Sequence, residues 1–200
     1  GGVNLYDPHQ TRFAHYRHDP DESAGLAEGS VNTIAEAGEG RLWVGTGEVV
    51  NLLDFASGQA TYYTLEAPAT IRAVHQDRTG VVWAGADGGL RLYRLNPTTG
   101  EFTLYPLESP FPPVGPSGPV TIVDIEEDAQ EDLWVATDRG GVFRLDPQRE
   151  KVQVYESPIS VAPVGGSPTP PGAPRPPIND LFMDRAGGIW VSTLNGINRL

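Results

Sequence analysis

Cysteine is absent from the 200-residue sequence, methionine occurs once, and long apolar runs are missing. The lack of cysteine excludes a disulfide framework and a thiolate metal site. No window approaches the roughly 20 apolar residues of a membrane-spanning helix, and no signal-peptide pattern opens the chain. We therefore predict no membrane contact by this segment. Because the chain begins with two glycines in the middle of a repeat, we expect it to be a piece of a longer protein.

Basic residues are also scarce, with 14 Lys and Arg against 26 Asp and Glu and a formal net charge of -12. Such a chain is repelled by phosphate backbones and anionic membrane surfaces, so we predict no nucleic-acid partner. Aromatic residues make up only 8%, whereas 24 glycines and 19 prolines indicate many turns. This composition favours an all-β chain with little helix.

The sequence repeats one pattern of short strands and turns. Its clearest copy has strands expected at 71–76, 81–86, 90–95 and 101–105, separated by turn residues such as Asp77 to Gly80. Each copy is therefore a four-stranded antiparallel sheet. The tryptophans occupy one equivalent position in the repeat, and we predict that they form its structural core: Trp43, Trp83, Trp134 and Trp190.

The whole chain, 1–200, is predicted to be a single propeller fragment. The predicted parts are the end of a blade at 1–17, complete blades at 30–65, 70–105 and 120–155, and the start of a blade at 178–200. Two proline-rich insertions, at 107–119 and 157–177, are expected to be surface loops because proline lacks an amide donor and restricts its neighbour. The repeat resumes in phase after each insertion, so neither is a domain boundary.

Each sheet carries apolar residues on both faces. Leu42 and Val44 point to one face and Trp43 to the other, so every sheet needs a neighbour on both sides. Radially stacked sheets of this size define a β-propeller. The prediction is an all-β propeller array of four-stranded antiparallel blades, three complete and two incomplete.

Three turns depart from the clearest copy. Ala37 stands where Asp77 does, Glu48 and Val49 replace the paired glycines, and Glu131 stands where Gly80 does. We expect the turn at Glu131 to be looser or differently shaped.

The motif Asp-x-x-Gly, two residues, Trp-Val-Gly-Thr, a glycine-rich turn and Leu-x-x-Leu-Asp-Pro resembles the two-component regulator propeller repeat. The resemblance implies the ligand-sensing or interaction region of a bacterial hybrid histidine kinase, on the periplasmic or extracellular side of the inner membrane. Such receptors are linked to polysaccharide use, so the implied partners are an oligosaccharide or other small ligand, further blades and signalling domains of the same protein, and a second copy in a homodimer. Kinase activity would then lie outside this chain.

Loops that vary in length are where binding sites tend to be built. Both insertions are expected on the side of the turns that follow the Trp strands. The candidate ligand-binding residues on that side are Glu48, Asp87, Asp138, Arg139 and Asn195. Ordinary turn formation is the competing explanation, because Asp and Asn favour such turns.

Other chemistry has weaker signals. Carbohydrate stacking on the tryptophans is disfavoured by their mid-strand position, and Tyr62, Tyr63, Tyr105 and Tyr155 are interpreted as packing or rim residues. His15 and His18 lie near Asp19, Asp21 and Glu22, but His-x-x-His in a strand places the two rings on opposite faces. We predict no metal and no cofactor.

No nucleophile motif or phosphate loop is present, and the adjacent pairs Glu126–Glu127 and Glu131–Asp132 point apart. We expect no raised-pKa pocket at these pairs, and hence no enzyme activity from these residues. Two alternatives stay open: a propeller enzyme of lyase or glycan-active type, and a scaffold propeller that binds proteins.

Overall fold

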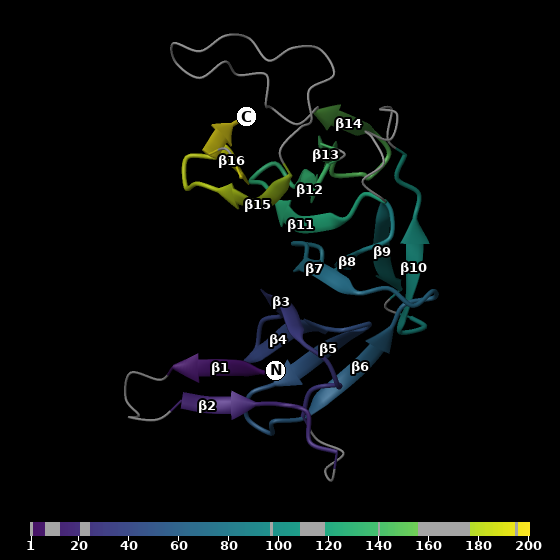
Figure 1. Ribbon diagram of the computed structural model, residues 1–200, viewed down its shortest axis with the longest axis vertical. Helices are drawn as coiled ribbons and strands as arrows, with labels where there is room; N and C mark the ends of the chain where they lie inside the picture. The colour runs from purple at the N-terminus through teal and green to yellow at the C-terminus, as the bar shows by residue number, and fades with distance from the viewer. Residues whose placement is uncertain are drawn as a thin grey trace. The chain divides into compact units, whose positions relative to one another are not determined.

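The computed structural model describes residues 2–6, 13–20, 25–96, 98–108, 119–139, 141–155, 177–194 and 196–200. These residues form β-strands and turns (Figure 1). Among them no helix has the length and hydropathy needed to cross a membrane.

The strands form sheets in chain order. The first sheet pairs β1 (Val3–Tyr6) with β2 (Phe13–Tyr16), and the second contains β3 (Val31–Glu36), β4 (Arg41–Thr46), β5 (Val49–Asp54) and β6 (Ala60–Thr64). The third contains β7 (Ile71–Gln76), β8 (Val82–Ala86), β9 (Arg91–Asn96) and β10 (Glu101–Tyr105). The fourth contains β11 (Ile122–Glu127), β12 (Leu133–Thr137), β13 (Gly141–Leu145) and β14 (Val152–Tyr155), and the last β15 (Ile178–Met183), β16 (Ile189–Thr193) and β17 (Gly196–Arg199).

Three of these sheets have four strands, one has three and one has two. The predicted all-β propeller fold, with three complete and two incomplete antiparallel blades, is confirmed. Most of the two proline-rich insertions lies outside the described residues, so their surface position stays a prediction. Leu107, at the start of the first insertion, is buried.

The chain divides into two compact units, one of residues 1–84 and 93–105 and one of residues 85–92 and 106–200. In the first unit β3 lies beside β7. Asn32 Nδ2 donates to the Ile71 carbonyl at 3.0 Å, and Thr33 Oγ1 accepts the Val74 amide at 3.2 Å. Neighbouring sheets in this unit are therefore joined through their first strands.

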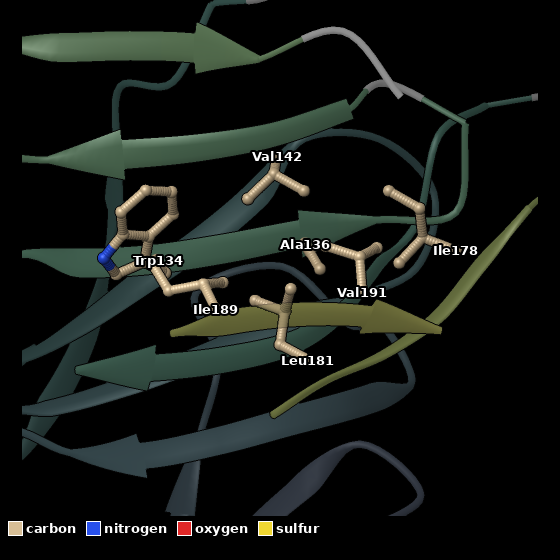
Figure 2. Close-up of a cluster of buried hydrophobic side chains, with 7 residues drawn as sticks. All are labelled: Trp134, Ala136, Val142, Ile178, Leu181, Ile189 and Val191. Atoms are coloured by element: carbon tan, nitrogen blue, oxygen red, sulfur yellow. The ribbon is translucent and has the colours of Figure 1, made fainter. Parts of the chain in front are cut away.

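In the second unit β11 lies beside β15. The apolar core between their sheets consists of Trp134, Ala136, Val142, Ile178, Leu181, Ile189 and Val191 (Figure 2). Trp134, Ala136 and Val142 come from β12 and β13, and the others from β15 and β16. Both sheets contribute a face to one core, as the two-sided apolar pattern requires.

A β-bulge recurs near the start of the first strand. The pairing register shifts between Val31 and Thr33, between Ile122 and Asp124, and between Ile178 and Asp180. Bulges bend a strand and re-aim the side chains next to them. Thr33 and Asp124 come directly after the bulges of β3 and β11, and each faces the next sheet. Each side chain accepts a backbone amide from that sheet.

The expectation of a looser turn at Glu131 is wrong. Asp128 N donates to the Asp132 carbonyl at 3.0 Å and Glu131 N to the Asp128 carbonyl at 3.1 Å, just as Asp77 N and Gly80 N close the turn at 77–81. Glu131 adopts φ 67° to do so, and Gly80 has φ 87°. The turn shape is kept because Glu131 takes up the left-handed conformation that glycine adopts without strain.

Candidate functional site

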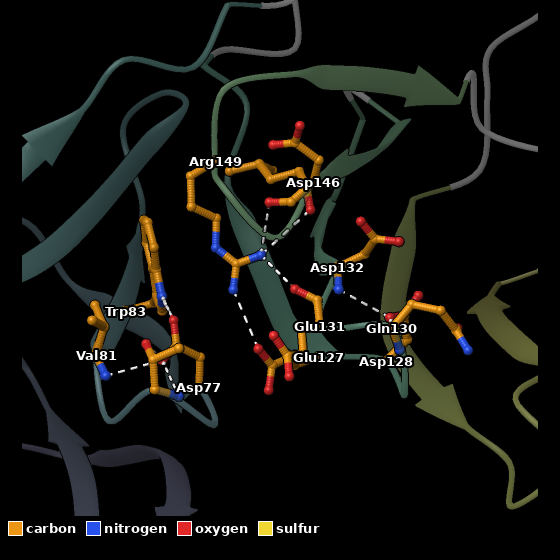
Figure 3. Close-up of polar contacts among 12 residues, drawn as sticks. Asp77, Val81, Trp83, Glu127, Asp128, Gln130, Glu131, Asp132, Asp146 and Arg149 are labelled. Atoms are coloured by element: carbon orange, nitrogen blue, oxygen red, sulfur yellow. Dashed lines mark hydrogen bonds and ion pairs between the residues drawn. The ribbon is translucent and has the colours of Figure 1, made fainter.

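A bond between an aspartate and a tryptophan organises one end of three sheets. Asp77 Oδ1 accepts the amides of Thr79 and Val81 at 3.1 and 3.0 Å, and Oδ2 accepts Trp83 Nε1 at 2.9 Å (Figure 3). The turn is thereby tied to the Trp strand. The corresponding bonds to Trp134 and Trp190 come from Asp128 at 2.8 Å and Asp184 at 2.7 Å.

The tryptophan rings are enclosed by residues of their own sheets. Trp43, Trp83 and Trp134 are buried, and Trp190 is half-buried. Tyr63, Tyr105 and Tyr155 of the fourth strands lie 5.5, 5.3 and 5.5 Å from the rings of Trp43, Trp83 and Trp134. Arg94, Arg144 and Arg199 of the third strands lie 5.8, 5.5 and 5.4 Å from the rings of Trp83, Trp134 and Trp190. Trp43, Trp83 and Trp134 are therefore packed within their sheets, whereas the Trp190 ring also lines a hollow on the last sheet.

Of the predicted ligand-binding residues, Glu48 is exposed in the turn between β4 and β5, and Asp87 is half-buried in the turn between β8 and β9. Asp138 and Arg139 share the turn after β12. Asn195 lies outside the described residues. The structure therefore places four of the five in turns that follow a Trp strand.

The Asp138 carboxylate is engaged within its own sheet. Its Oδ1 accepts the Thr121 amide at 2.8 Å, and its Oδ2 accepts Arg139 Nε at 3.1 Å. Its carbonyl accepts the Ile178 amide at 3.0 Å, in the way that the Gly47 carbonyl accepts the Ile71 amide at 2.8 Å. Asp138 thus has a structural role, and it orients Arg139, whose Nη2 also donates to the Pro119 carbonyl at 3.2 Å.

Three carboxylates that were not among the predicted site residues gather on the first strands of the second unit. Asp124 Oδ2 accepts the Leu181 amide at 2.8 Å, and Oδ1 accepts the Ile125 amide at 2.8 Å. Burial, together with a hydrogen bond that the Asp124 carboxyl donates to Asp180 and the charges of Glu126 and Asp180, raises the pKa of Asp124 to about 7. Burial and the charge of Asp180 also raise the pKa of Glu126.

The expectation of no raised pKa at Glu126–Glu127 is therefore wrong for Glu126. Its neighbour Glu127 faces a different partner, since Arg149 Nη2 lies 3.3 Å from Glu127 Oε1 and Nη1 lies 2.7 Å from the Glu131 carbonyl (Figure 3). The two adjacent carboxylates do point apart. The sequence did carry a signal for this carboxylate cluster. Asp124 and Asp180 occupy the repeat position that holds Thr33 and Ala73 in the other copies.

An apolar hollow of about 460 Å3 lies on the last sheet, lined by Asp180, Leu181, Phe182, Asp184, Trp190, Ser192 and Ile197. A more polar hollow of about 330 Å3 lies in the first unit between the outer strands β6 and β10, next to Glu66 and Glu101.

Within the described residues, no group of three or more His, Cys, Asp or Glu side chains is arranged to hold a metal ion. Asp21 and Glu22, which belong to the cluster around His15 and His18, lie outside the described residues.

The fold and the repeated Asp–Trp bond define a β-propeller. The model of the two-component regulator propeller matches residues 25–48. The chain carries this repeat, as the resemblance predicted. No curated protein matches the sequence significantly.

Solved structures of similar fold cover most of the chain. The extracellular domain of BT4673 from B. thetaiotaomicron, described as a hybrid two-component system with one structure and as a one-component system with another, aligns over 99% of this chain and 23% of its own length, with 20% identity and a TM-score of 0.71. PorZ of Porphyromonas gingivalis, a surface component of the type-IX secretion system, aligns over 98% of this chain and 28% of its own, with 20% identity and a TM-score of 0.62.

An inactive variant of virginiamycin B lyase from Staphylococcus aureus, solved with quinupristin, aligns over 92% of this chain and 55% of its own, with 18% identity and a TM-score of 0.64. These similarities establish the fold. The chain spans about a quarter of the length of the extracellular domains it matches.

Proposed function

We propose that the chain is part of the ligand-sensing or interaction propeller of a bacterial two-component receptor. The observation that carries this proposal is the match of residues 25–48 to the two-component regulator propeller. The fold similarity to the extracellular domain of a hybrid two-component system supports it over 99% of the chain.

In this proposal the chain lies on the periplasmic or extracellular side of the inner membrane. Its partners are further blades and signalling domains of the same protein, and a second copy in a homodimer. Kinase chemistry belongs to those other domains, and ligand binding would act by changing the packing of the blades or the dimer.

The proposed ligand is an oligosaccharide or another small polar molecule at the turns that follow the Trp strands. Glu48 is exposed there, and Arg139 is held by Asp138 with 28% of its side chain exposed. A carboxylate or guanidinium group presented on a turn can hydrogen-bond the hydroxyls of a ligand. Asp87 and Asn195 belong to the same set of turns by their sequence positions.

The test is calorimetric titration of the chain with a panel of oligosaccharides, comparing substitutions in turns that follow a Trp strand with substitutions in turns that precede one. Glu48→Ala and Arg139→Ala are expected to weaken binding. The matched controls Glu39→Ala and Arg185→Ala remove the same charges from exposed turns before the Trp strands and are expected to leave affinity unchanged. Equal losses from both sets would place the ligand elsewhere, and the absence of binding across the panel would exclude the glycan.

The second candidate is a propeller enzyme of lyase type. The raised pKa of Asp124 favours it, because a carboxyl that titrates near neutrality suits general acid–base chemistry. Both carboxylate oxygens already accept backbone amides, however, so the sensor remains the proposal. Turnover of a polysaccharide or of quinupristin that is lost in Asp124→Asn would make the enzyme the better proposal. Retention of a protein from the same organism by the chain, without any glycan affinity, would favour the scaffold alternative.

A further inference from the structure

The apolar hollow lies on the last sheet, and its lining residues other than Leu181 do not belong to the core of Figure 2. It is bordered by large side chains in contact with solvent: Phe182 is 63% exposed and Ile197 is 71% exposed. Exposed apolar patches of this kind mark interaction surfaces or ligand grooves. The equivalent face of the preceding sheet indicates that this face is an interaction surface.

The hollow corresponds residue by residue to a surface that is covered in the preceding sheet. Strand pairing aligns Trp190 with Arg199 as it aligns Trp134 with Arg144, and Ser192 with Ile197 as it aligns Ala136 with Val142. Trp190, Ser192 and Ile197 are thus the equivalents of Trp134, Ala136 and Val142. The latter three pack against aliphatic side chains of the next sheet, namely Ile178, Leu181, Ile189 and Val191.

A polar contact accompanies that apolar one. Asp124, directly after the β-bulge of β11, accepts the Leu181 amide of the next sheet at 2.8 Å. Thr33, after the bulge of β3, accepts the Val74 amide of its next sheet at 3.2 Å. Asp180 follows the bulge of β15 in the same way, and it is exposed beside the hollow.

We propose that this face is the docking surface for a further sheet of the same repeat, with Asp180 accepting a backbone amide from the first strand of that sheet. The incoming sheet would fill the hollow with aliphatic side chains equivalent to Ile178, Leu181, Ile189 and Val191. The hollow is therefore an interface between sheets and not a site for a small ligand. This inference stands on the repeat alone, so it can fail while the proposed sensing function holds, and the reverse.

The chain supplies its own best-matched partner for a test. Leu200 follows Arg199 as Leu145 follows Arg144, so a second copy of residues 146–200 added after Leu200 continues the repeat in phase. Because the sequence has no cysteine, Ile197→Cys in the first copy provides a single reactive thiol. Its reaction with a maleimide is compared between the 200-residue chain and the extended chain.

We expect the thiol to react about tenfold more slowly, or slower still, in the extended chain, because protection requires the interface to open before reaction. Ala56→Cys, in an exposed turn of the first unit, is the control and is expected to react at the same rate in both chains. Asp180→Ala in the first copy should restore part of the lost reactivity, since the incoming amide would lose its acceptor.

Equal rates for the Ile197→Cys thiol in the two chains would overturn the proposal, whether or not the added segment folds, because that segment carries the very side chains that pack in the existing interface. Protection of the thiol in the 200-residue chain that rises with protein concentration would also overturn it. That result would assign the face to a second copy of the chain.

Discussion

Trp43 donates its indole N–H to Gln76 Oε1, 3.0 Å away on the first strand of the next sheet. The other three tryptophans donate instead to an aspartate six residues earlier in their own sheet. The difference follows from Ala37, which stands at the position of those aspartates. A bond within one sheet has been exchanged for a bond between two sheets.

The first prediction tests this exchange. Gln76→Ala should lower the free energy of unfolding by about 1–3 kcal/mol, because it leaves the N–H of a buried tryptophan unsatisfied. In an Ala37→Asp background the loss should be much smaller, because the new carboxylate can accept that N–H. Urea unfolding of the four proteins of this double-mutant cycle measures the difference.

The double-mutant cycle also removes a second effect of Gln76→Ala on the free energy of unfolding. Gln76 Nε2 donates to the Gly80 carbonyl at 3.2 Å, and this bond is lost in both backgrounds, so it cancels. Gln59→Ala, at an exposed position, is the control for a glutamine deletion. The same loss from Gln76→Ala with and without Ala37→Asp would contradict the account.

The second prediction concerns the left-handed conformation of Glu131. A left-handed residue other than glycine costs roughly 1–2 kcal/mol, and part of the gain from a glycine is offset by its greater freedom in the unfolded chain. Glu131→Gly should therefore raise the free energy of unfolding by about 0.5–1 kcal/mol. The contact from Arg149 is to the Glu131 carbonyl and does not depend on the side chain.

The reverse substitution provides the matched control. Gly80 has φ 87°, and a Cβ added there would meet Gln76 Nε2 at 3.8 Å, an ordinary van der Waals contact, so Gly80→Glu should destabilise by a similar amount without a steric clash. Thermal unfolding of both variants measures the pair. A destabilising Glu131→Gly would show that the Glu131 side chain contributes more than its strained backbone costs.

The third prediction separates two arginines that lie over tryptophan rings. Arg144 Nε also donates to Asp132 Oδ2 at 3.0 Å, and Asp132 is buried, whereas Val81 stands at the equivalent position below Arg94. Arg144→Leu leaves a buried carboxylate without its cation and should cost about 2–4 kcal/mol in unfolding free energy. Arg94→Leu should cost about 0.5–1 kcal/mol, the cation–π term alone.

Leucine is the appropriate replacement because Leu52 pairs with Trp43 at this position of another sheet. Chemical denaturation of the two variants gives the comparison. Equal costs would mean that the ion pair with Asp132 adds nothing to stability beyond the cation–π contact.

The sequence was sufficient for the strands and their grouping, since alternation of apolar residues and turn chemistry are local signals. It was insufficient for contacts that depend on two sheets at once. The bond from Leu181 to Asp124 joins residues 57 apart and requires the bulge at Asp124, which no local pattern encodes. At Glu131 the hydrogen bonds that close the turn outweighed a local conformational preference.

The last prediction is a dependence of stability on pH that comes from Asp124. Burial raises its pKa from 3.8 to about 7, so the folded state binds a proton that the unfolded state has released between about pH 4 and pH 7. The stability contributed by this group is fully present below pH 4 and is lost as the pH rises through 7. Asp124→Asn cannot ionise and its amide oxygen can still accept the Leu181 amide, so the variant should gain stability relative to the wild type as the pH rises.

Urea unfolding of both proteins at pH 5 and pH 8 measures this relative gain. Asp146→Asn is the control, because hydrogen bonds from the Lys151 and Glu150 amides lower the pKa of Asp146. A group with a lowered pKa loses its contribution only when the pH falls through that value, so Asp146 adds no slope between pH 5 and pH 8. If Asp124→Asn and Asp146→Asn shift in parallel with the wild type over this range, the Asp124 carboxyl is ionised in the folded state. The contact between β11 and β15 would then tolerate a buried charge beside Asp180 and Glu126.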